Sequence, residues 1–334
     1  MSPLKATSAL KQSLLIAIVA ILAVVSLLIL RGGCRSSSKD QLNLRPVRLA
    51  YIPYSADLPF FVAIEKGYFG ELGIAVEPIP CKSSSEALDL VLAGKADGAM
   101  GNSFSVLFSI HAKNSDTIRL INVSLETADQ DRFTGFALVG PDSVIDSPSL
   151  LQGKTIGTEK GASQLLWVKL YLSSLGIDPV NDVRIEQEAP ETLLNALHAG
   201  QIDALFVFEP YATIGLTKGL AKPLQPFFRR SIINPFPAGG ATLSRDFCAK
   251  EPAAADKVIE AIDRAIDLIN HQPEEAKLAL LPYVPLDRET ALKSQIYLWW
   301  GSSEIRQEPV QKLADIMAEN DQLASRIDVS TFIR

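Results

Sequence analysis

The sequence predicts an α/β protein of two similar lobes joined by two crossing segments, each lobe a mixed, mainly parallel sheet flanked by helices. The first observation behind this prediction is an internal repeat. Residues 72–74 (Leu-Gly-Ile) lead through a strand, a loop and a helix to residues 93–99, and residues 175–177 (Leu-Gly-Ile) lead through the same series to residues 199–205. The second observation is that strand and helix patterns alternate in both halves, which is typical of parallel sheets covered on both faces.

The first half contains three expected strands, at residues 47–52, 74–79 and 98–101. Between the first two, Ser55, Asp57 and Pro59 form a helix start, with a capping side chain followed by proline in the first turn. This helix is expected to end near Gly67. A second helix is expected to follow Ser83.

The second half has the same order of elements between two segments that cross from lobe to lobe. Residues 136–139 are expected to cross from the first lobe to the second, and the proline-rich residues 222–237 to cross back. The pattern from residue 252 onward is helical, and Trp299 and Trp300 in it favour core or hinge packing over stacking on a ligand. The expected division is therefore a first lobe at residues 45–135 and 238–334 and a second lobe at residues 136–237.

Length and charge narrow the class of protein. A chain of 334 residues exceeds one average domain and fits two once the N-terminus is set aside. Its formal net charge of −6 argues against a nucleic-acid partner, and no basic stripe with interleaved aromatic residues occurs in the sequence.

The N-terminus predicts export or a membrane anchor at residues 1–34, followed by a polar linker at residues 35–44. Residues 13–30 form an uncharged apolar run long enough to cross a hydrocarbon core of roughly 30 Å. The following Gly-Gly-Cys34 resembles the end of a lipoprotein signal, although Arg31 stands where such signals carry an aliphatic residue. Two alternatives stay open, a lipidated Cys34 and an uncleaved anchor helix, with simple cleavage a lesser third. The first two place a tethered protein in the periplasm or at the cell surface.

The remaining cysteines and the histidines predict no metal site. Cys81 and Cys248 are either joined by a disulfide or present as two small buried residues. The histidines are scattered, and no Cys/His cluster has the spacing of metal ligands.

Candidate ligand-binding residues lie where the expected strands end, because ligands of open α/β sheets bind beyond the carboxyl ends of the strands. Several of these positions also begin helices, where unpaired N–H groups attract anions. The expected ligand-binding residues are Tyr51, Tyr54, Ser55, Leu58, Pro59, Ser83, Ser84, Asn102, Ser103, Lys160, Gly161, Ala162, Ser163, Glu209 and Tyr211.

Each candidate also has an ordinary structural interpretation. The serines at 83–85 favour helix capping, and lysines such as Lys160 are more often solvated than bound to ligand. Glu209 follows five apolar strand residues and precedes a proline, so it either pairs with a cationic ligand group or holds a neighbouring loop. Asp97 and Asp203 occupy matching places in the two repeats, which indicates one structural turn used twice rather than a catalytic pair.

Catalysis finds little support in the sequence. It contains no Gly-x-Ser-x-Gly elbow, phosphate-binding loop, Gly-x-Gly-x-x-Gly fingerprint or His-Glu-x-x-His helix. We therefore expect neither enzymatic activity nor a cofactor.

Motifs in both halves resemble the nitrate/sulfonate/taurine-type substrate-binding proteins of ABC importers, a group that overlaps the thiamine-pyrimidine-synthase-like proteins. The first-half motif is Ala63-x-x-x-Gly67-Tyr68-Phe69-x-x-Leu72-Gly73-Ile74, followed by Ala93-Gly94-x-x-Asp97. The second half adds Leu151-x-Gly153-Lys154-x-Ile156-Gly157, Gly200-x-x-Asp203-Ala204 and Glu209-Pro210. The resemblance covers roughly residues 45–285.

The resemblance implies a type II periplasmic-binding-protein-like fold that closes on a small solute and delivers it to a membrane permease. A sulfonate-, nitrate- or pyrimidine-like solute is expected. Because no arginine lies in the expected ligand loops, tight binding of an inorganic anion is not assured. An enzyme of the same fold, of thiamine-pyrimidine or menaquinone biosynthesis, and a sensory ligand-binding module are the alternatives. The chain lacks the cysteine cluster of the thiamine-pyrimidine synthase.

Overall fold

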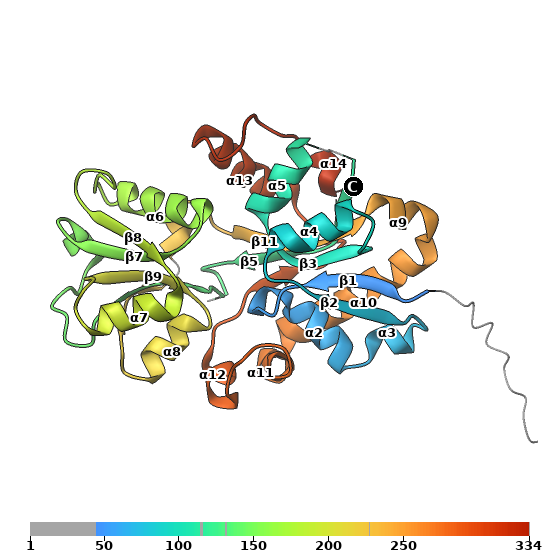
Figure 1. The fold of residues 1–334 in the computed structure, drawn as a ribbon, viewed down its shortest axis with the longest axis horizontal. Coiled ribbons are helices and arrows are strands. Elements are labelled where there is room, and N and C mark those ends of the chain that lie inside the picture. Colours follow the sequence, from blue (N-terminus) through green and yellow to red (C-terminus); the bar gives the residue numbers. More distant parts are fainter. Residues whose placement is uncertain (1–44, 114–115, 131, 227, 334) are drawn as a thin grey trace, which may run out of the picture. The chain divides into compact units, whose positions relative to one another are not determined.

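The computed structural model describes residues 45–113, 116–130, 132–226 and 228–333 (Figure 1). The apolar run at residues 13–30, Cys34 and the expected linker lie outside the described residues. Within the described ranges, no helix has both the length and the apolar character needed to span a membrane. Residues 46–334 form one compact unit by their contacts, and the description below concerns that unit.

The larger sheet has seven strands in the order β12-β5-β11-β3-β1-β2, with β4 paired to β11. Strand β1 is parallel to β2 and β3, whereas the pairings of β11 and β5 are antiparallel. Its strands are β1 (Val47–Tyr51), β2 (Val76–Pro80), β3 (Gly98–Ser103), β4 (Ile118–Leu120), β5 (Val123–Glu126), β11 (Phe236–Ser244) and β12 (Leu298–Trp300).

The smaller sheet has five strands in the order β10-β6-β9-β7-β8. Here β7 is parallel to β8 and β9, and β6 is antiparallel to β9 and β10. Its strands are β6 (Gly135–Val139), β7 (Thr155–Glu159), β8 (Arg184–Glu188), β9 (Ala204–Phe208) and β10 (Lys222–Pro226). The mixed sheets are confirmed, but the expectation of mainly parallel pairing is wrong, because parallel pairing is confined to three adjacent strands in each sheet and the crossing segments add antiparallel neighbours.

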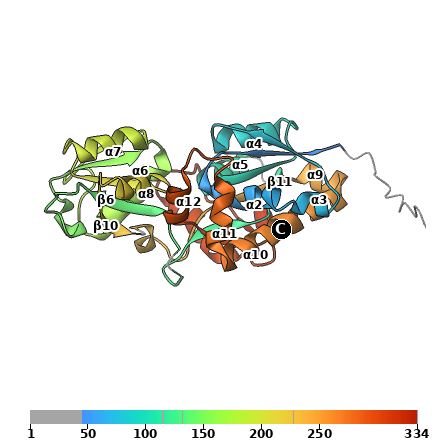
Figure 2. The ribbon, with the colours of Figure 1, turned by 90° about the horizontal axis from the view of Figure 1, so that it is seen from below.

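Helices cover both faces of each sheet, as Figures 1 and 2 show. On the larger sheet, α4 and α5 lie on one face and α2 and α10 on the other; on the smaller sheet, α6 lies opposite α7 and α8. The helices are α2 (Leu58–Glu65), α3 (Tyr68–Glu71), α4 (Ser84–Leu92), α5 (Phe104–Lys113), α6 (Ala162–Ser174), α7 (Pro190–His198), α8 (Tyr211–Thr217), α9 (Arg245–Lys250), α10 (Pro252–His271), α11 (Pro273–Lys277), α12 (Arg288–Lys293), α13 (Gln307–Glu319) and α14 (Ser330–Ile333).

Sheet membership changes twice along the chain. It changes between β5 and β6, and it changes back between β10 and β11. Both changes fall near the expected crossings, and the exact division at 135/136 and 237/238 stays a prediction, because residues 46–334 pack as one unit.

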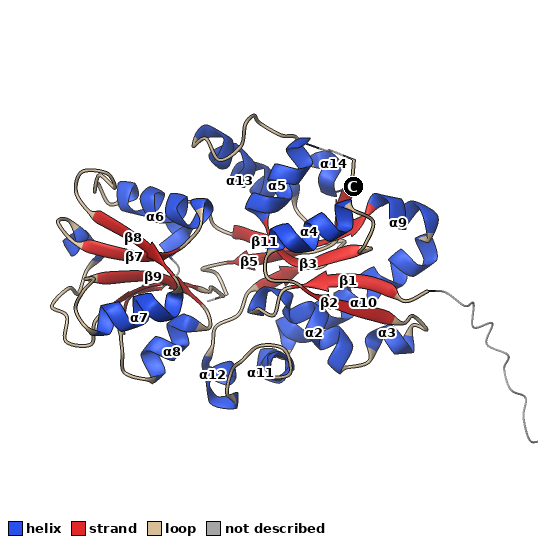
Figure 3. Cartoon of the chain, viewed as in Figure 1, coloured by secondary structure: helices blue, strands red, loops and turns tan. Residues whose placement is uncertain are grey.

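The structure decides two expectations, one about the tryptophans at 299 and 300 and one about the cysteines at 81 and 248. Trp299 and Trp300 lie in strand β12 rather than in a helix, because they pair with Ser124 and Val123 of β5. Figure 3 shows the strands of the two sheets in red and the flanking helices in blue. Trp299 is fully buried, so the expectation of core packing is confirmed for it. Cys81 and Cys248, both within the described residues, are free and not joined by a disulfide.

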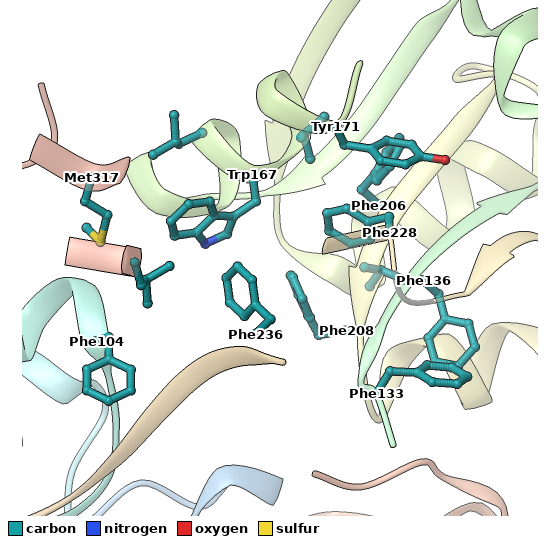
Figure 4. Close-up of a cluster of buried hydrophobic side chains, with 14 of the residues drawn as sticks. Phe104, Phe133, Phe136, Trp167, Tyr171, Phe206, Phe208, Phe228, Phe236 and Met317 are labelled. Atoms are coloured by element: carbon teal, nitrogen blue, oxygen red, sulfur yellow. The ribbon is translucent and has the colours of Figure 1, made fainter. Parts of the chain in front are cut away.

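A cluster of buried aromatic side chains packs between the smaller sheet and the start of β11. Figure 4 shows Trp167 of α6 beside Phe236 of β11, with Phe208, Phe228 and Phe206 next along. The Trp167 and Phe236 ring centroids are 5.2 Å apart, and those of Phe206 and Phe228 are 5.0 Å apart. Edge-to-face pairs of this kind add to the free energy gained from burial alone.

A candidate ligand-binding cleft at the strand ends

The ends of strands from both sheets meet around a cavity of about 200 Å³. From the larger sheet it is lined by Ile52 and Tyr54 after β1 and by residues 101–103 at the end of β3. From the smaller sheet it is lined by Glu159 at the end of β7 and Phe208 at the end of β9. The parallel strands of the two halves thus direct their carboxyl ends to one place, as expected for ligand sites in open α/β sheets.

Two further cavities adjoin this one. A cavity of about 330 Å³ shares Ser103, Gln164 and Arg229 with it and is bordered by the N-terminus of α6. A more apolar cavity of about 550 Å³ shares Tyr54 and is bordered by α7, α8 and residues 284–286. We call the cavity of 200 Å³ the central cavity.

Nine of the expected ligand-binding residues line these cavities. Four line the central cavity: Tyr54, Ser84, Asn102 and Ser103. Four more line the cavity of 330 Å³: Lys160, Gly161, Ala162 and Ser163. Tyr211 lines the cavity of 550 Å³, where its hydroxyl donates to Glu191 Oε1 at 2.6 Å. Their roles as ligand contacts stay a prediction.

Other expected residues pack elsewhere. Tyr51 belongs to an aromatic cluster with Phe60, Phe61 and Tyr283, and its ring lies edge-on to Phe61 at 5.6 Å. Leu58 and Pro59 are buried in the first turn of α2. Apolar packing of α2 against the sheet accounts for all three positions.

The residues expected to cap helices have different roles in the structure. Ser83 is the N-cap of α4 and accepts from Glu86 N at 3.2 Å, as its structural interpretation predicts. Ser84 Oγ instead accepts from Ser103 N at 3.3 Å, which joins two cavity residues. Ser55 and Asp57 are buried, and neither makes a side-chain capping bond within the described structure, so their expected capping role is wrong.

Glu209 is occupied by structural hydrogen bonds. Its buried carboxylate accepts from Thr213 N at 3.1 Å and Thr213 Oγ1 at 2.9 Å, both in α8. It also accepts from Gln295 N at 2.9 Å, a residue that precedes β12. Burial raises the pKa of Glu209, and these bonds oppose that rise. The geometry favours the second of its two interpretations, that of holding a neighbouring loop.

Arg229 is a cavity residue that the sequence analysis missed. It lies in a short helical turn (Phe228–Ser231) after β10, inside the expected return crossing, and lines both the central cavity and that of 330 Å³. The sequence offered one feature that could have indicated Arg229: it lies in the expected return crossing, and a segment that joins two lobes passes the cleft between them.

The Arg229 guanidinium contacts one carboxylate and two aromatic rings. Its Nε donates to Glu126 Oε2 at 2.9 Å, and its Nη2 lies 2.6 Å from Glu126 Oε1. Its Cζ lies 4.5 Å from the Phe208 ring centroid and 4.4 Å from that of Phe236, two rings that Figure 4 shows. Glu126 in turn accepts from Thr134 N, Thr134 Oγ1 and Gly135 N at 2.8 to 3.0 Å. These contacts tie the two crossing segments together.

Glu159 is the other charged side chain of the central cavity. It is partly buried, and its Oε1 accepts from Phe208 N at 3.2 Å. Burial raises the pKa of Glu159, while the Phe208 hydrogen bond and Arg229 oppose that rise. Burial also raises the pKa of Tyr54 well above its usual value, and the Glu159 charge adds to that rise.

Two side-chain amides at the cavity have hydrogen-bonding capacity that the protein does not use. Neither amide atom of the fully buried Asn102 finds a partner among the described residues, nor does Gln164 Oε1. Because a buried polar group without a partner costs free energy, each such atom in a cleft indicates a place where a ligand or water completes the bonding. The described residues contain no His/Cys/Asp/Glu cluster that could hold a metal ion.

The comparisons with known proteins identify the family of the chain. Residues 40–281 match the NMT1-like family, and because this match spans well over half of the chain, the protein belongs to that family. The expected relation to nitrate/sulfonate/taurine-type substrate-binding proteins is thereby confirmed.

Two curated relatives differ in how much of their length the chain covers. A putative aliphatic sulfonates-binding protein of Bacillus subtilis (strain 168) is 26% identical over 330 residues, which are 94% of this chain and 95% of that protein. Bicarbonate-binding protein CmpA of Synechococcus elongatus is 22% identical over 271 residues, which are 73% of this chain but 58% of CmpA.

A solved structure shows the fold. The periplasmic aliphatic sulphonate binding protein SsuA from Escherichia coli superposes with a TM-score of 0.71 at 17% identity, covering 87% of this chain and 92% of SsuA. The expected two-lobed, periplasmic-binding-protein-like fold is confirmed.

Proposed function

We propose that this protein is an extracytoplasmic solute-binding protein of an ABC importer, which captures a small organic solute in the cleft and delivers it to a membrane permease. The observation that carries the proposal is the central cavity, where strand ends of both halves bring unpaired amides and a carboxylate around one space. Closure of two lobes on a solute that contacts both would supply the free energy of the closed state.

The relatives support binding rather than catalysis. Those with substantial coverage are named as binding proteins for bicarbonate, for nitrate or nitrite, and for aliphatic sulfonates. One further relative, from Synechocystis, is named a nitrate import ATP-binding protein, which supports an ABC transporter as the partner. The solute class proposed here is sulfonate-, nitrate- or pyrimidine-like; the names of the relatives support the first two.

A thermal-unfolding panel on the purified full-length chain tests this function. A solute at a hundredfold excess over its Kd should stabilise the folded state by about 2.7 kcal/mol, which is a readily measured shift. The panel contains alkanesulfonates, nitrate, bicarbonate, pyrimidines and uncharged amides. If none of these solutes moves the unfolding midpoint, the receptor function is contradicted.

The cellular location is part of the same proposal. Export through residues 1–34 would place the cleft outside the cytoplasmic membrane, with the chain tethered by an N-terminal helix or by a lipid on Cys34. Mass spectrometry of the chain purified from membranes distinguishes the two tethers: a chain that begins at Cys34 with added acyl mass supports lipidation, and a chain that retains residues 1–33 supports the helix.

A further inference from the structure

The charges around the central cavity determine which of the proposed solutes it can accept. Among the described residues that line it, Arg229 is the one positively charged side chain and Glu159 the one carboxylate. Whether other residues neutralise each of these two charges therefore decides whether the cavity attracts an anion.

The positive charge of Arg229 is already compensated. Its ion pair with the fully buried Glu126, made through one hydrogen bond from Nε, leaves the two side chains together neutral. The Phe208 and Phe236 rings pack against the guanidinium, and its Nη2 forms no hydrogen bond within the described residues. An anion would have to compete with Glu126 for a cation that is clamped in place, and breaking a buried pair leaves an uncompensated charge.

The charge of Glu159 is not compensated in the same way. Within the part of the chain that the structure describes, the Glu159 carboxylate forms no ion pair and accepts one hydrogen bond, from Phe208 N. Its neighbours Asn102 and Gln164 offer two unpaired amide oxygens that accept N–H donors, beside two unpaired donors, Asn102 Nδ2 and Arg229 Nη2. With the Arg229–Glu126 pair neutral, an ionised Glu159 gives the central cavity a net negative charge.

The N-termini of α4 and α6 do not reverse this balance at the central cavity. The start of α4 is occupied by the Glu86 carboxylate, whose Oε2 accepts from Lys82 N at 2.7 Å. The start of α6 has no side-chain cap and favours an anion, but its residues 161–163 line the neighbouring cavity. Lys160 beside it is paired with Glu188 at 2.8 Å.

We infer that the central cavity selects a neutral or protonated nitrogen solute with N–H donors, of the amide or amidine class, over inorganic anions and sulfonates. This inference rests on the proposed solute-binding function and narrows its range of solutes. The N–H groups of such a solute would donate to Glu159 and to the amide oxygens of Asn102 and Gln164.

Three probes of matched shape and different charge test the inference: benzoate, benzamide and benzamidine. Isothermal titration of the full-length chain should give Kd values for benzamide and benzamidine at least about tenfold lower than that for benzoate. Benzoate binding as tightly as either of the others would overturn the inference, and so would no binding of all three. In both cases the proposed function still stands if another solute of the panel stabilises the protein.

A variant tests whether the Glu159 carboxylate causes the preference for benzamidine. Glu159→Gln keeps an oxygen that can accept from Phe208 N, and it should abolish the advantage of benzamidine over benzamide. Glu186→Gln, on the exposed Arg184–Glu186 pair of β8, is the matched control and should leave all three Kd values unchanged. An undiminished benzamidine preference in a folded Glu159→Gln variant would overturn the role of this carboxylate. If that variant does not fold, the three-probe series on the parent chain decides the question.

Discussion

The two halves of the repeat carry the same aspartate in the same turn, but the two aspartates differ in burial. Asp97 Oδ2 accepts from Arg48 N of β1 at 2.8 Å, and Asp203 Oδ2 accepts from Thr155 N of β7 at 2.8 Å. Asp97 is 4% exposed and also pairs with the Arg48 guanidinium at 2.9 Å. Asp203 is 40% exposed, and Lys154 lies 3.9 Å away. One sequence pattern therefore makes one local hydrogen bond, while its surroundings decide how much that bond contributes.

The halves also differ at the strand ends that form the site. Asp97 accepts from Arg48 N, and Asp203 accepts from Thr155 N. Ile52 lies four residues after Arg48, and Glu159 lies four residues after Thr155. The two side chains are therefore equivalent in the repeat, and both line the central cavity. At this one position the first half has an apolar side chain and the second half a carboxylate. The repeat builds a symmetric frame, and the chemistry of the site comes from positions where the repeats differ.

Replacing the two aspartates tests the comparison most strongly. Asp97→Ala should lower the free energy of unfolding by about 3 kcal/mol, because it leaves Arg48 N and a partly buried guanidinium without their partner. Asp203→Ala should cost only about 1 kcal/mol, because water can replace much of what the exposed carboxylate does. Urea titration measures both losses, and equal losses would contradict the difference in burial.

A smaller change in the free energy of unfolding is expected at the residues that follow the two aspartates, Gly98 in the first half and Ala204 in the second. A Cβ at Gly98 would lie 2.6 Å from Leu243 Cδ2 and 2.8 Å from the Thr242 carbonyl oxygen of β11. Gly98→Ala should therefore cost about 2 kcal/mol through overpacking. The reverse change, Ala204→Gly, should cost about 1 kcal/mol through lost burial and added chain entropy. A Gly98→Ala variant as stable as the parent in thermal unfolding would show that β11 adapts to the methyl group.

The smallest effect concerns pH and Glu159, the residue that replaces Ile52 in the second half. Because burial raises the pKa of Glu159, the folded state binds more protons than the unfolded state between the ordinary and the raised pKa. The stability of the parent should fall as pH rises through that window. Glu159→Gln should remove this fall, so the variant gains stability relative to the parent at about pH 8 but not at about pH 4. A difference that is the same at both pH values would contradict the assignment.

The order of elements and the strand-end location of the site were predictable because they depend on local signals. The capping of α4 by Ser83, the paired turns at Asp97 and Asp203, and the cavity positions of Tyr54, Asn102 and Ser103 follow from spacing and from the rule for open sheets. Arg229, Glu126 and Tyr297 were not predictable as neighbours. They come from three separate segments that meet only when the crossings fold.

The sequence by itself determined a repeated α/β frame with strand ends that converge, because hydrophobic periodicity and turn residues act over a few positions. Only the tertiary structure decided the charge of the cleft, because that depends on which distant carboxylate reaches which cation. Glu126 neutralises Arg229 from across the chain, while Glu159 remains without an ion pair in the described structure. The electrostatic character of the site is thus a property of contacts between remote residues.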